Sequence, residues 1–265
     1  MKTYLVTGGA GFIGSHLTRR LLQADHEVVV LDNLKTGLRE HVPPQADFVA
    51  MDICDDRLID VVSNGRFDAI VHLAAQTMVD ASIREPAYDA QVNIQGTVNV
   101  LEAARQGKVQ RVVFASTAAS YGDVSADQLP IEESQPLSPL SFYGLSKVTV
   151  EQYLALYQQC FQLDYVVLRF ANVYGERQGD VLACRERIEQ VGVLEDKAQL
   201  TAAILAQVGR LEHREVAAVH HDGAGVGILQ AADQVKKRRL ARARRPQHDA
   251  DLAAVDGRVD AVEHS

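Results

Sequence analysis

The sequence lacks the features that mark membrane and exported proteins. No apolar run approaches the roughly 18 residues of a membrane-spanning helix, so we expect no membrane partner. The opening residues, MKTYLVTGG, lead straight into a strand pattern, without the basic stretch and cleavage site of an export signal. The 3 cysteines are scattered at no ligand spacing. These absences favour a cytoplasmic protein with reduced thiols.

Aromatic residues are absent from the last third of the chain. The 7 Phe and 8 Tyr residues all lie at or before Tyr174, and none occurs between there and Ser265. Aromatic side chains supply much of the buried area of ordinary protein cores. The tail is therefore compositionally foreign to the part of the chain that precedes it.

The chain also lacks the charge and ligand patterns of nucleic-acid and metal-binding proteins. A net charge of −8 argues against a nucleic-acid partner. The basic run Lys236–Arg245 has no interleaved aromatic residues, which is typical of a solvated segment. His213, His220 and His221 have no acid at ligand spacing, so we predict no metal site.

Short apolar runs alternate with longer helical patterns through the first two-thirds of the chain. Runs of Val and Leu without polar alternation are typical of strands buried on both faces of a parallel sheet. The expected strands are residues 3–8, 27–32, 47–52, 68–74, 110–116 and 164–170, and the expected helices are residues 12–22, 86–105 and 143–160. The alternation predicts the α/β class, with a doubly wound parallel (Rossmann) sheet over residues 1–178 and an atypical segment over residues 179–265.

A glycine-rich loop, TGGAGFIG, follows the first expected strand and opens a helix. Gly8, Gly11 and Gly14 let the backbone turn tightly, approach a pyrophosphate and pack the helix against the sheet. The helix N-terminus offers unpaired N–H groups to such an anion. Asp32, at the end of the second strand, can accept both hydroxyls of an adenosine ribose and repel a 2′-phosphate. The motif therefore predicts NAD rather than NADP, and we expect Asp52-Ile53 to border the adenine.

A tyrosine and a lysine share one helical face in the stretch YGLSK, as Tyr143 and Lys147. A tyrosine with a pKa of about 10 is a poor base at neutral pH. We expect the lysine and a bound nicotinamide cation to lower that pKa. The stretch STAASYG places the hydroxyls of Ser116 and Thr117 where the fifth strand ends.

In combination, these motifs identify a family resemblance. The stretches TGGAGFIG, VLDNL, HLAAQ, STAASYG, YGLSK and LRFANVYGERQ resemble the extended short-chain dehydrogenase/reductase family, and within it the NAD-dependent sugar-nucleotide epimerases and dehydratases. The likeness covers residues 3–178 and is closest to members of the UDP-glucose 4-epimerase type. By this resemblance Thr117 hydrogen-bonds the sugar O4, Tyr143 accepts its proton, and Lys147 activates the tyrosine and binds the ribose. Asn93 would support the active-site helix, and Asn172 would contact the substrate diphosphate.

The resemblance implies three sets of site residues. The catalytic set is Thr117, Tyr143 and Lys147, and the substrate set is Thr117, Tyr143 and Asn172. The NAD set is Gly8, Gly11, Phe12, Ile13, Gly14, Asp32, Asn33, Asp52, Ile53, Leu73, Ala74, Ala75, Asn93, Ser116, Tyr143, Lys147 and Phe170. The expected partner is a nucleotide-sugar substrate.

Two alanines follow Thr117 where the dehydratases and decarboxylases that resemble this chain carry an acid. Neither Ala118 nor Ala119 can exchange a proton. A cycle that needs no acid is oxidation at C4, rotation of the keto sugar and return of the hydride to the opposite face. We therefore predict C4 epimerisation of a nucleotide sugar of the UDP-glucose/UDP-galactose type. A dehydratase, or a dehydrogenase or reductase on a similar sugar nucleotide, stays open as an alternative.

The chain departs from the family after GERQ. Family members continue into a substrate domain that clamps the nucleotide, and no such pattern follows Asp180. A shifted reading frame, or joining to an unrelated segment, would explain the loss of aromatic residues. Two alternatives therefore stand beside the enzyme: a non-catalytic NAD-binding protein, and an inactive truncated or frameshifted epimerase.

Two further expectations concern packing. The apolar helix faces around residues 92–104 and 148–157 could form a homodimer bundle, as in the relatives. His72 ends the fourth strand, and we expect a packed, hydrogen-bonded structural histidine there rather than a cofactor contact.

Overall fold

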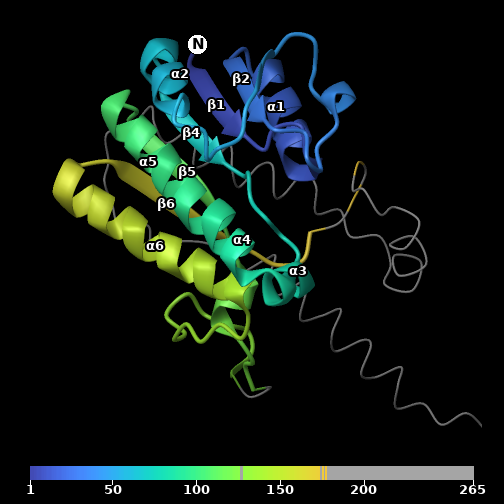
Figure 1. Ribbon diagram of the computed structural model, residues 1–265, viewed down its shortest axis with the longest axis vertical. Coiled ribbons are helices and arrows are strands. Elements are labelled where there is room, and N and C mark those ends of the chain that lie inside the picture. Colours follow the sequence, from blue (N-terminus) through green and yellow to red (C-terminus); the bar gives the residue numbers. More distant parts are fainter. Residues whose placement is uncertain (126–127, 174, 176, 178–265) are drawn as a thin grey trace, which may run out of the picture.

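A parallel sheet of six strands forms the centre of the protein (Figure 1). The computed structural model describes residues 1–125, 128–173, 175 and 177. The strands are β1 (Thr3–Thr7), β2 (Glu27–Asp32), β3 (Asp47–Ala50), β4 (Ala69–His72), β5 (Arg111–Thr117) and β6 (Asp164–Phe170). Their order, β3-β2-β1-β4-β5-β6, confirms the predicted doubly wound sheet. The segment 179–265, with the basic run and the histidines considered as metal ligands, lies outside the described residues.

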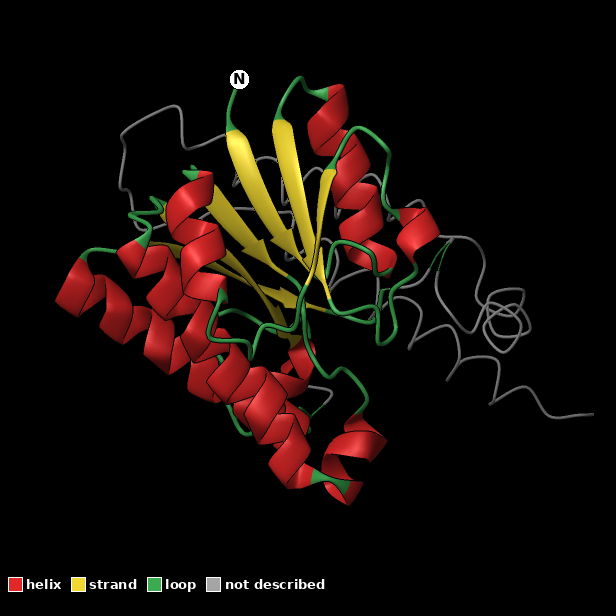
Figure 2. Ribbon diagram, turned by 45° about the horizontal axis from the view of Figure 1, so that its top comes forward, coloured by secondary structure: helices red, strands yellow, loops and turns green. Residues whose placement is uncertain are grey.

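Helices cover both faces of the sheet (Figure 2). They are α1 (Phe12–Gln23), α2 (Leu58–Gly65), α3 (Val79–Arg84), α4 (Pro86–Ala90), α5 (Thr97–Gln106) and α6 (Phe142–Phe161). On one face, Leu17 and Leu21 of α1 pack into a buried cluster with Val6 and Val30. The other face carries α2, α5 and α6 over a second cluster. Among the described residues, none of these helices is both long and apolar enough to cross a bilayer.

The single helix expected over residues 86–105 is divided into three parts. Between α4 and α5 the chain forms a π-helical turn, Gln91–Gly96. Asn93 and Thr97 are buried there, and Thr97 Oγ1 donates a hydrogen bond to the Asn93 carbonyl at 2.7 Å. Such wide turns are frequent at functional sites. The side-chain bonds of Asn93, described below, offset the cost of the irregular backbone.

The winding direction of the sheet changes at β1. This strand lies between β2 and β4, so the chain proceeds first toward one edge of the sheet and then toward the other. In sheets of this kind, ligands bind at that point, outside the carboxyl ends of the strands. β3 and β4 end earlier than expected, at Ala50 and His72, because the residues that follow turn into loops at this carboxyl edge.

Candidate active site

The loop between β1 and α1 has a shape that side chains would obstruct. Gly8 has a φ of +70°, and a Cβ there would lie 2.7 Å from a main-chain nitrogen just after β4. A Cβ on Gly14 would overlap the carbonyl oxygen of Gly8. Phe12 and Ile13 begin α1, and Gly11 caps its N-terminus without a side-chain hydrogen bond. The bare loop and the uncapped N–H groups form a cradle that fits a dinucleotide pyrophosphate.

Asp32 holds this loop from the end of β2. Its side chain is buried; Oδ2 accepts a hydrogen bond from the main-chain N–H of Ala10 at 3.0 Å, and Oδ1 accepts one from Leu34 at 2.8 Å. A carboxylate has about four acceptor positions, so each oxygen keeps capacity for a further donor. Asp32 can therefore accept ribose hydroxyls beside the cradle, and its charge disfavours a 2′-phosphate.

Asn33 and Asp52 tie the ends of β2 and β3 together. Asn33 Nδ2 donates to Asp52 Oδ2 at 2.7 Å, and the main-chain N–H of Cys54 donates to Asp52 Oδ1 at 2.9 Å. Burial raises the pKa of Asp52, but these hydrogen bonds and the charge of Lys35 outweigh burial, so the net pKa is lowered. Asp52 is therefore held ionised at the predicted adenine position.

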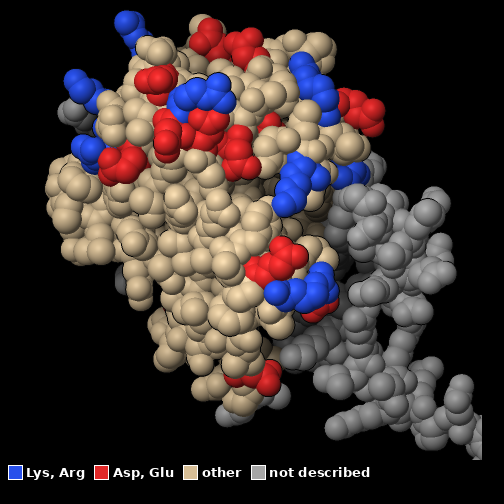
Figure 3. Space-filling view, in the orientation of Figure 1, with Lys and Arg blue, Asp and Glu red and all other residues tan. Residues whose placement is uncertain are grey.

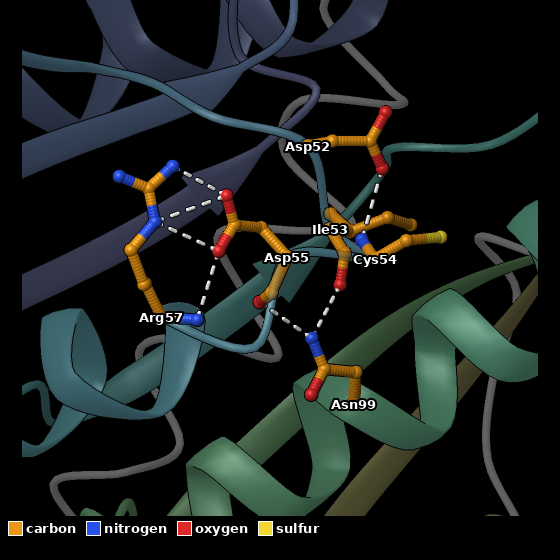
Figure 4. A network of polar contacts seen from close by, with 6 residues as sticks. All are labelled: Asp52, Ile53, Cys54, Asp55, Arg57 and Asn99. Atoms are coloured by element: carbon orange, nitrogen blue, oxygen red, sulfur yellow. Dashed lines mark hydrogen bonds and ion pairs between the residues drawn. The ribbon is translucent and has the colours of Figure 1, made fainter.

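A polar network fixes the loop after β3 (Figure 4). Asn99 of α5 donates from Nδ2 to the carbonyl of Ile53 at 2.7 Å and to that of Asp55 at 2.9 Å. Arg57 pairs with Asp55, with 2.6 Å between Nη2 and Oδ2. Because α5 is packed into the core, these bonds hold Ile53 and its neighbour Asp52 in one position at the carboxyl edge.

Thr117, Tyr143 and Lys147 meet at the carboxyl end of β5. Thr117 is the last residue of that strand, and the side chain of Ser141 caps α6 so that Tyr143 lies in its first turn. The Thr117 hydroxyl lies close enough to the Tyr143 phenol to lower the pKa of the phenol. Lys147 is buried, its Nζ donates to the carbonyl of Ala115 at 2.9 Å, and Nζ lies 5.9 Å from the centroid of the Tyr143 ring.

The protein's own groups shift the pKa values of the tyrosine and the lysine in opposite directions. Burial raises the pKa of Tyr143, the Thr117 hydrogen bond lowers it, the charge of Asp89 raises it, and the net pKa is raised. Burial lowers the pKa of Lys147 to about 8, against an upward effect of Asp89. The lowering of the Tyr143 pKa that we expected from Lys147 and a bound nicotinamide cation together is not produced by the protein groups alone. The ring is buried, and the ammonium bonds to Ala115 instead.

A second charged cluster braces the same strand end. Ser116 Oγ donates to Glu151 Oε1 at 2.5 Å, and Arg169 of β6 pairs with Glu151, with 2.7 Å between Nη2 and Oε2. Arg169 Nη1 also donates to the hydroxyl of Tyr121 at 2.8 Å. Glu151 lies one helical turn after Lys147, so α6 bonds to two successive residues of β5. The Ser116 hydroxyl, predicted to contact the cofactor, is turned toward Glu151.

His72 is fully enclosed and bonded at both ring nitrogens. Its Nδ1 lies 2.7 Å from Thr7 Oγ1 and its Nε2 lies 2.9 Å from Thr97 Oγ1. The Thr97 hydroxyl donates to Asn93, so it accepts from His72 Nε2–H, and Nδ1 in turn accepts from Thr7. Burial, followed by the charge of Lys147, lowers the pKa of His72 to about 3. This is the packed, hydrogen-bonded histidine that we expected.

Asn93 lies at the centre of a buried polar network. Its Nδ2 donates to Asp89 Oδ1 at 3.0 Å and to Ser146 Oγ at 3.3 Å, and its Oδ1 accepts from the main-chain N–H of Gln76 at 2.9 Å. Gln76 Nε2 donates to the same Asp89 oxygen at 2.9 Å. The network joins the π-helical turn, the loop after β4 and α6 at the residue before Lys147, which is the geometry of a residue that supports α6.

The remaining predicted residues lie at the same edge of the sheet. The segment 73–75 follows β4, and its main chain borders Gly8. Phe170 ends β6 and is paired in register with Thr117. Asn172 is exposed, two residues beyond β6. Within the part of the chain that the structure describes, no three His, Cys, Asp or Glu side chains gather as a candidate metal site.

Sequence reasoning missed four residues: Gln76, Asp89, Glu151 and Arg169. For the two acids, Asp89 and Glu151, the spacing in the sequence could have indicated their partners. Glu151 follows Lys147 by four residues and Asp89 precedes Asn93 by four residues, a spacing that places both members of each pair on one helical face. Gln76 and Arg169 lie within motifs that we recognised, but nothing in the spacing indicates their partners.

Sequence comparisons relate the chain to known proteins. Residues 4–191 match the profile of a family described as NAD dependent epimerase/dehydratase. A putative UDP-glucose 4-epimerase of Methanocaldococcus jannaschii is 44% identical over 175 residues, which cover 66% of this chain and 57% of that protein. The chain spans about half the length of the curated relatives it matches.

Solved structures extend the likeness to three dimensions. The UDP-glucose 4-epimerase of Thermus thermophilus, in complex with NAD, has a TM-score of 0.71 at 35% identity, covering 88% of this chain and 83% of that chain. A UDP-N-acetylglucosamine 4-epimerase from Methanobrevibacter ruminantium, in complex with UDP-N-acetylmuramic acid, has a TM-score of 0.63 at 34% identity, covering 67% and 57%. The similarity is therefore one of sequence as well as of fold.

Proposed function

Because the chain belongs to the NAD dependent epimerase/dehydratase family, we propose that residues 1–178 bind NAD and that the protein inverts C4 of a nucleotide sugar. The meeting of Thr117, Tyr143 and Lys147 at the end of β5 carries this proposal. The glycine cradle and Asp32 lie at the same edge of the sheet. The complex of a solved relative with NAD supports the same cofactor here.

The residues of this edge fit NAD at three points. The side-chain-free loop at Gly8 and Gly14 suits the pyrophosphate, and Asp32 suits the adenosine ribose. Lys147 uses one N–H for the Ala115 carbonyl and keeps two for the hydroxyls of the second ribose. When bound, NAD supplies the acceptor and donor of a hydride, and its nicotinamide cation opposes the raised pKa of Tyr143.

Tyr143 is the base of the proposed reaction. The phenol, as phenolate, takes the proton of the sugar O4 hydroxyl while a hydride leaves C4, and a 4-keto sugar results. Thr117 hydrogen-bonds O4 and the tyrosine together. After the keto sugar rotates, the hydride returns to the opposite face of C4 and Tyr143 returns the proton to O4, so protons and electrons balance over the cycle. Ala118 and Ala119 supply no acid for loss of water, which favours inversion over dehydration.

The substrate is proposed to be a UDP-hexose of the glucose/galactose type, and the test is inversion at C4. Purified full-length protein is incubated with UDP-galactose, UDP-glucose or UDP-N-acetylglucosamine, and the H4 signals are followed by proton NMR. We expect conversion of UDP-galactose and a loss of roughly 10²- to 10⁴-fold in rate for Tyr143→Phe, which removes the base and keeps the ring. The exposed Asp80→Asn variant is the control and should retain the rate. Absence of inversion with all three sugars would refute the proposed activity.

A second candidate is a non-catalytic NAD-binding protein. It is favoured by one observation, that the family match covers residues 4–191 and not the 74 residues that follow them. Binding and turnover separate the two candidates. Calorimetric binding of NAD without inversion of any of the three sugars supports the second, whereas binding with inversion supports the first.

A homodimer through α6 is also proposed. This helix of 20 residues has two charged members, Lys147 and Glu151, and both are turned inward. Leu145 and Leu156 are 51% and 55% exposed. Figure 3 shows few charged side chains over the adjoining face. Light scattering should give twice the chain mass for the wild type and a lower mass for Leu145→Glu with Leu156→Glu; an unchanged mass would exclude this interface.

A further inference from the structure

Asp89 is buried with half of its carboxylate unbonded. It lies on α4 and is 1% exposed. Oδ1 accepts hydrogen bonds from Gln76 and Asn93, but among the described residues no donor reaches the buried Oδ2. An isolated buried carboxylate is costly unless an opposite charge lies close by. The burial of Asp89 therefore points to a cation in the same part of the core.

Lys147 is a buried cation on α6, the helix that packs against α4. It is 3% exposed on α6, and the bond from its Nζ to the Ala115 carbonyl uses one of three N–H donors. α4 packs against α6, and Asn93 bonds to Asp89 on one side and to Ser146, the neighbour of Lys147, on the other. A buried anion and a buried cation, each incompletely bonded, are thus held on two helices that one asparagine joins.

We propose that Asp89 is the buried counter-charge of Lys147 and a positioning residue of the candidate active site. The proposal rests on the proposed function only for its catalytic meaning, since the charge relationship exists without turnover. Within the described part of the chain, the side-chain hydrogen bonds of Asp89 come from Gln76 and Asn93 and not from Lys147 or Tyr143. Asp89 therefore acts through Asn93 and through its charge.

The electrostatic environment supports this assignment. The charge of Asp89 opposes the lowering of the Lys147 pKa by burial, and it adds to the raised pKa of Tyr143. The charged residues of α3, Asp80 and Arg84, are exposed, and the buried member of that helix, Ser82, is uncharged.

The other groups around the pair are neutral or already paired. His72, whose pKa is lowered to about 3, carries no charge at neutral pH, and Asn93 does not titrate. Glu151, one turn beyond Lys147, is bonded to Ser116 and Arg169. Asp89 is therefore the carboxylate that acts on both Tyr143 and Lys147.

The test is a pH titration that needs no turnover. Full-length protein carrying ¹³C-labelled lysine and tyrosine is titrated by NMR as wild type, Asp89→Asn and Asp80→Asn, with the two signals assigned from Lys147→Met and Tyr143→Phe. We expect the midpoints of Lys147 and of Tyr143 both to fall by about one pH unit in Asp89→Asn, because a nearby negative charge is lost. Asp80→Asn, which removes an exposed charge of the same kind, should move neither. Unmoved midpoints in Asp89→Asn would overturn the proposal.

Two further variants of Asp89 serve as a replacement and as a control in this titration. If Asp89→Asn does not fold, Asp89→Ser takes its place in the titration. The midpoints of Lys147 and Tyr143 should fall in the same way, and unmoved midpoints would again overturn the proposal. Asp89→Glu retains the charge and should keep both midpoints near the wild-type values, whereas a purely steric role predicts a shift there too. If the protein inverts UDP-galactose, both limbs of its pH-rate profile should move to lower pH in Asp89→Asn. If it does not, the midpoints still decide the charge relationship, and the proposed function fails separately.

Discussion

Asp32 and Ala10 are joined across the nucleotide loop, with 3.0 Å between Oδ2 of the acid and the main-chain nitrogen. The same carboxylate that is proposed to bind the ribose thus also shapes the loop that is proposed to bind the pyrophosphate. Asp32→Asn replaces one acceptor oxygen by a donor, so it loses a loop bond or a ribose bond. Each charge-assisted bond contributes about 1.5 to 3 kcal/mol. We expect the Kd for NAD to rise roughly 10- to 100-fold by calorimetry.

In Asp32→Asn the ratio of the Kd for NADP to the Kd for NAD should also become smaller. Removing the negative charge ends the repulsion of a 2′-phosphate. Asp60→Asn, a change of the same kind on the exposed side of α2, is the control and should alter neither Kd. If Asp32→Asn bound NAD as tightly as the wild type, the ribose contact would be excluded.

Gly14 and Gly11 should separate folding from cofactor binding. A Cβ at position 14 would overlap the carbonyl oxygen of Gly8, whereas one at position 11 would lie 3.2 Å from that atom, at an ordinary φ of −79°. Gly14→Ala should therefore lower the free energy of unfolding by about 1 to 3 kcal/mol, as overpacking does. Gly11→Ala should change it by less than about 0.5 kcal/mol.

Both variants should bind NAD weakly, for different reasons. In Gly11→Ala the new methyl group would stand where the pyrophosphate is proposed to approach, so calorimetry should show weak binding of NAD to a normally stable protein. Equal losses of stability in the two variants, measured by urea unfolding, would contradict the different roles of the two glycines.

Glu151 and Arg169 should contribute more to stability than an exposed ion pair does. Their side chains are 10% and 23% exposed, and Glu151 also receives the Ser116 hydroxyl. Glu151→Gln leaves Arg169 without its counter-charge, so we expect a loss of about 2 to 3 kcal/mol, below the value for a fully buried pair. Arg105→Gln breaks the more exposed pair with Glu102 and should cost less than about 1 kcal/mol in the same urea unfolding experiment. Similar losses of unfolding free energy in the two variants would show that the Glu151–Arg169 pair does not stabilise the end of β5.

The sheet could be predicted from the sequence because its signals are local. Uninterrupted Val and Leu runs gave β2 and β6 their correct bounds, and the glycines with Asp32 located the nucleotide loop. The helix over residues 86–105 was predicted as continuous because its apolar spacing is regular. The π-helical turn depends on hydrogen bonds between Asn93 and Gln76, 17 residues apart in the chain, and the apolar periodicity does not indicate that contact.

The chemistry of the site was harder to predict than its location. Motif spacing placed Tyr143 and Lys147 on one helical face, but the shift in the tyrosine pKa depends on burial, which the whole fold determines. The cluster of Ser116, Glu151 and Arg169 joins β5, α6 and β6, and its members are separated by 35 and 18 residues along the chain. Roles for residues in clusters of this kind can be assigned only once the three-dimensional arrangement is known.

His72 should make the protein sensitive to mild acid. In the folded protein its pKa is lowered to about 3, first by burial and then by the charge of Lys147, whereas an unfolded histidine titrates at about 6.5. Above that value both states carry a neutral ring. As the pH falls below it, the unfolded chain binds a proton that the folded protein refuses, so stability is lost until the folded pKa is reached. Between pH 7.5 and pH 5 this single group should remove about 2 kcal/mol from the free energy of unfolding.

His72→Gln tests this because glutamine can offer one donor and one acceptor but does not titrate. The variant should be less stable at pH 7.5, since it loses the ring stacked on Phe114 with 5.8 Å between centroids. Its further loss between pH 7.5 and pH 5, measured by urea unfolding at both values, should nevertheless be smaller than that of the wild type. Carboxylates titrate equally in the two proteins, so the difference between the two losses isolates the histidine. Equal losses would mean that the ring takes up a proton in the folded state, and the bonds from Thr7 and Thr97 would then have to be reassigned.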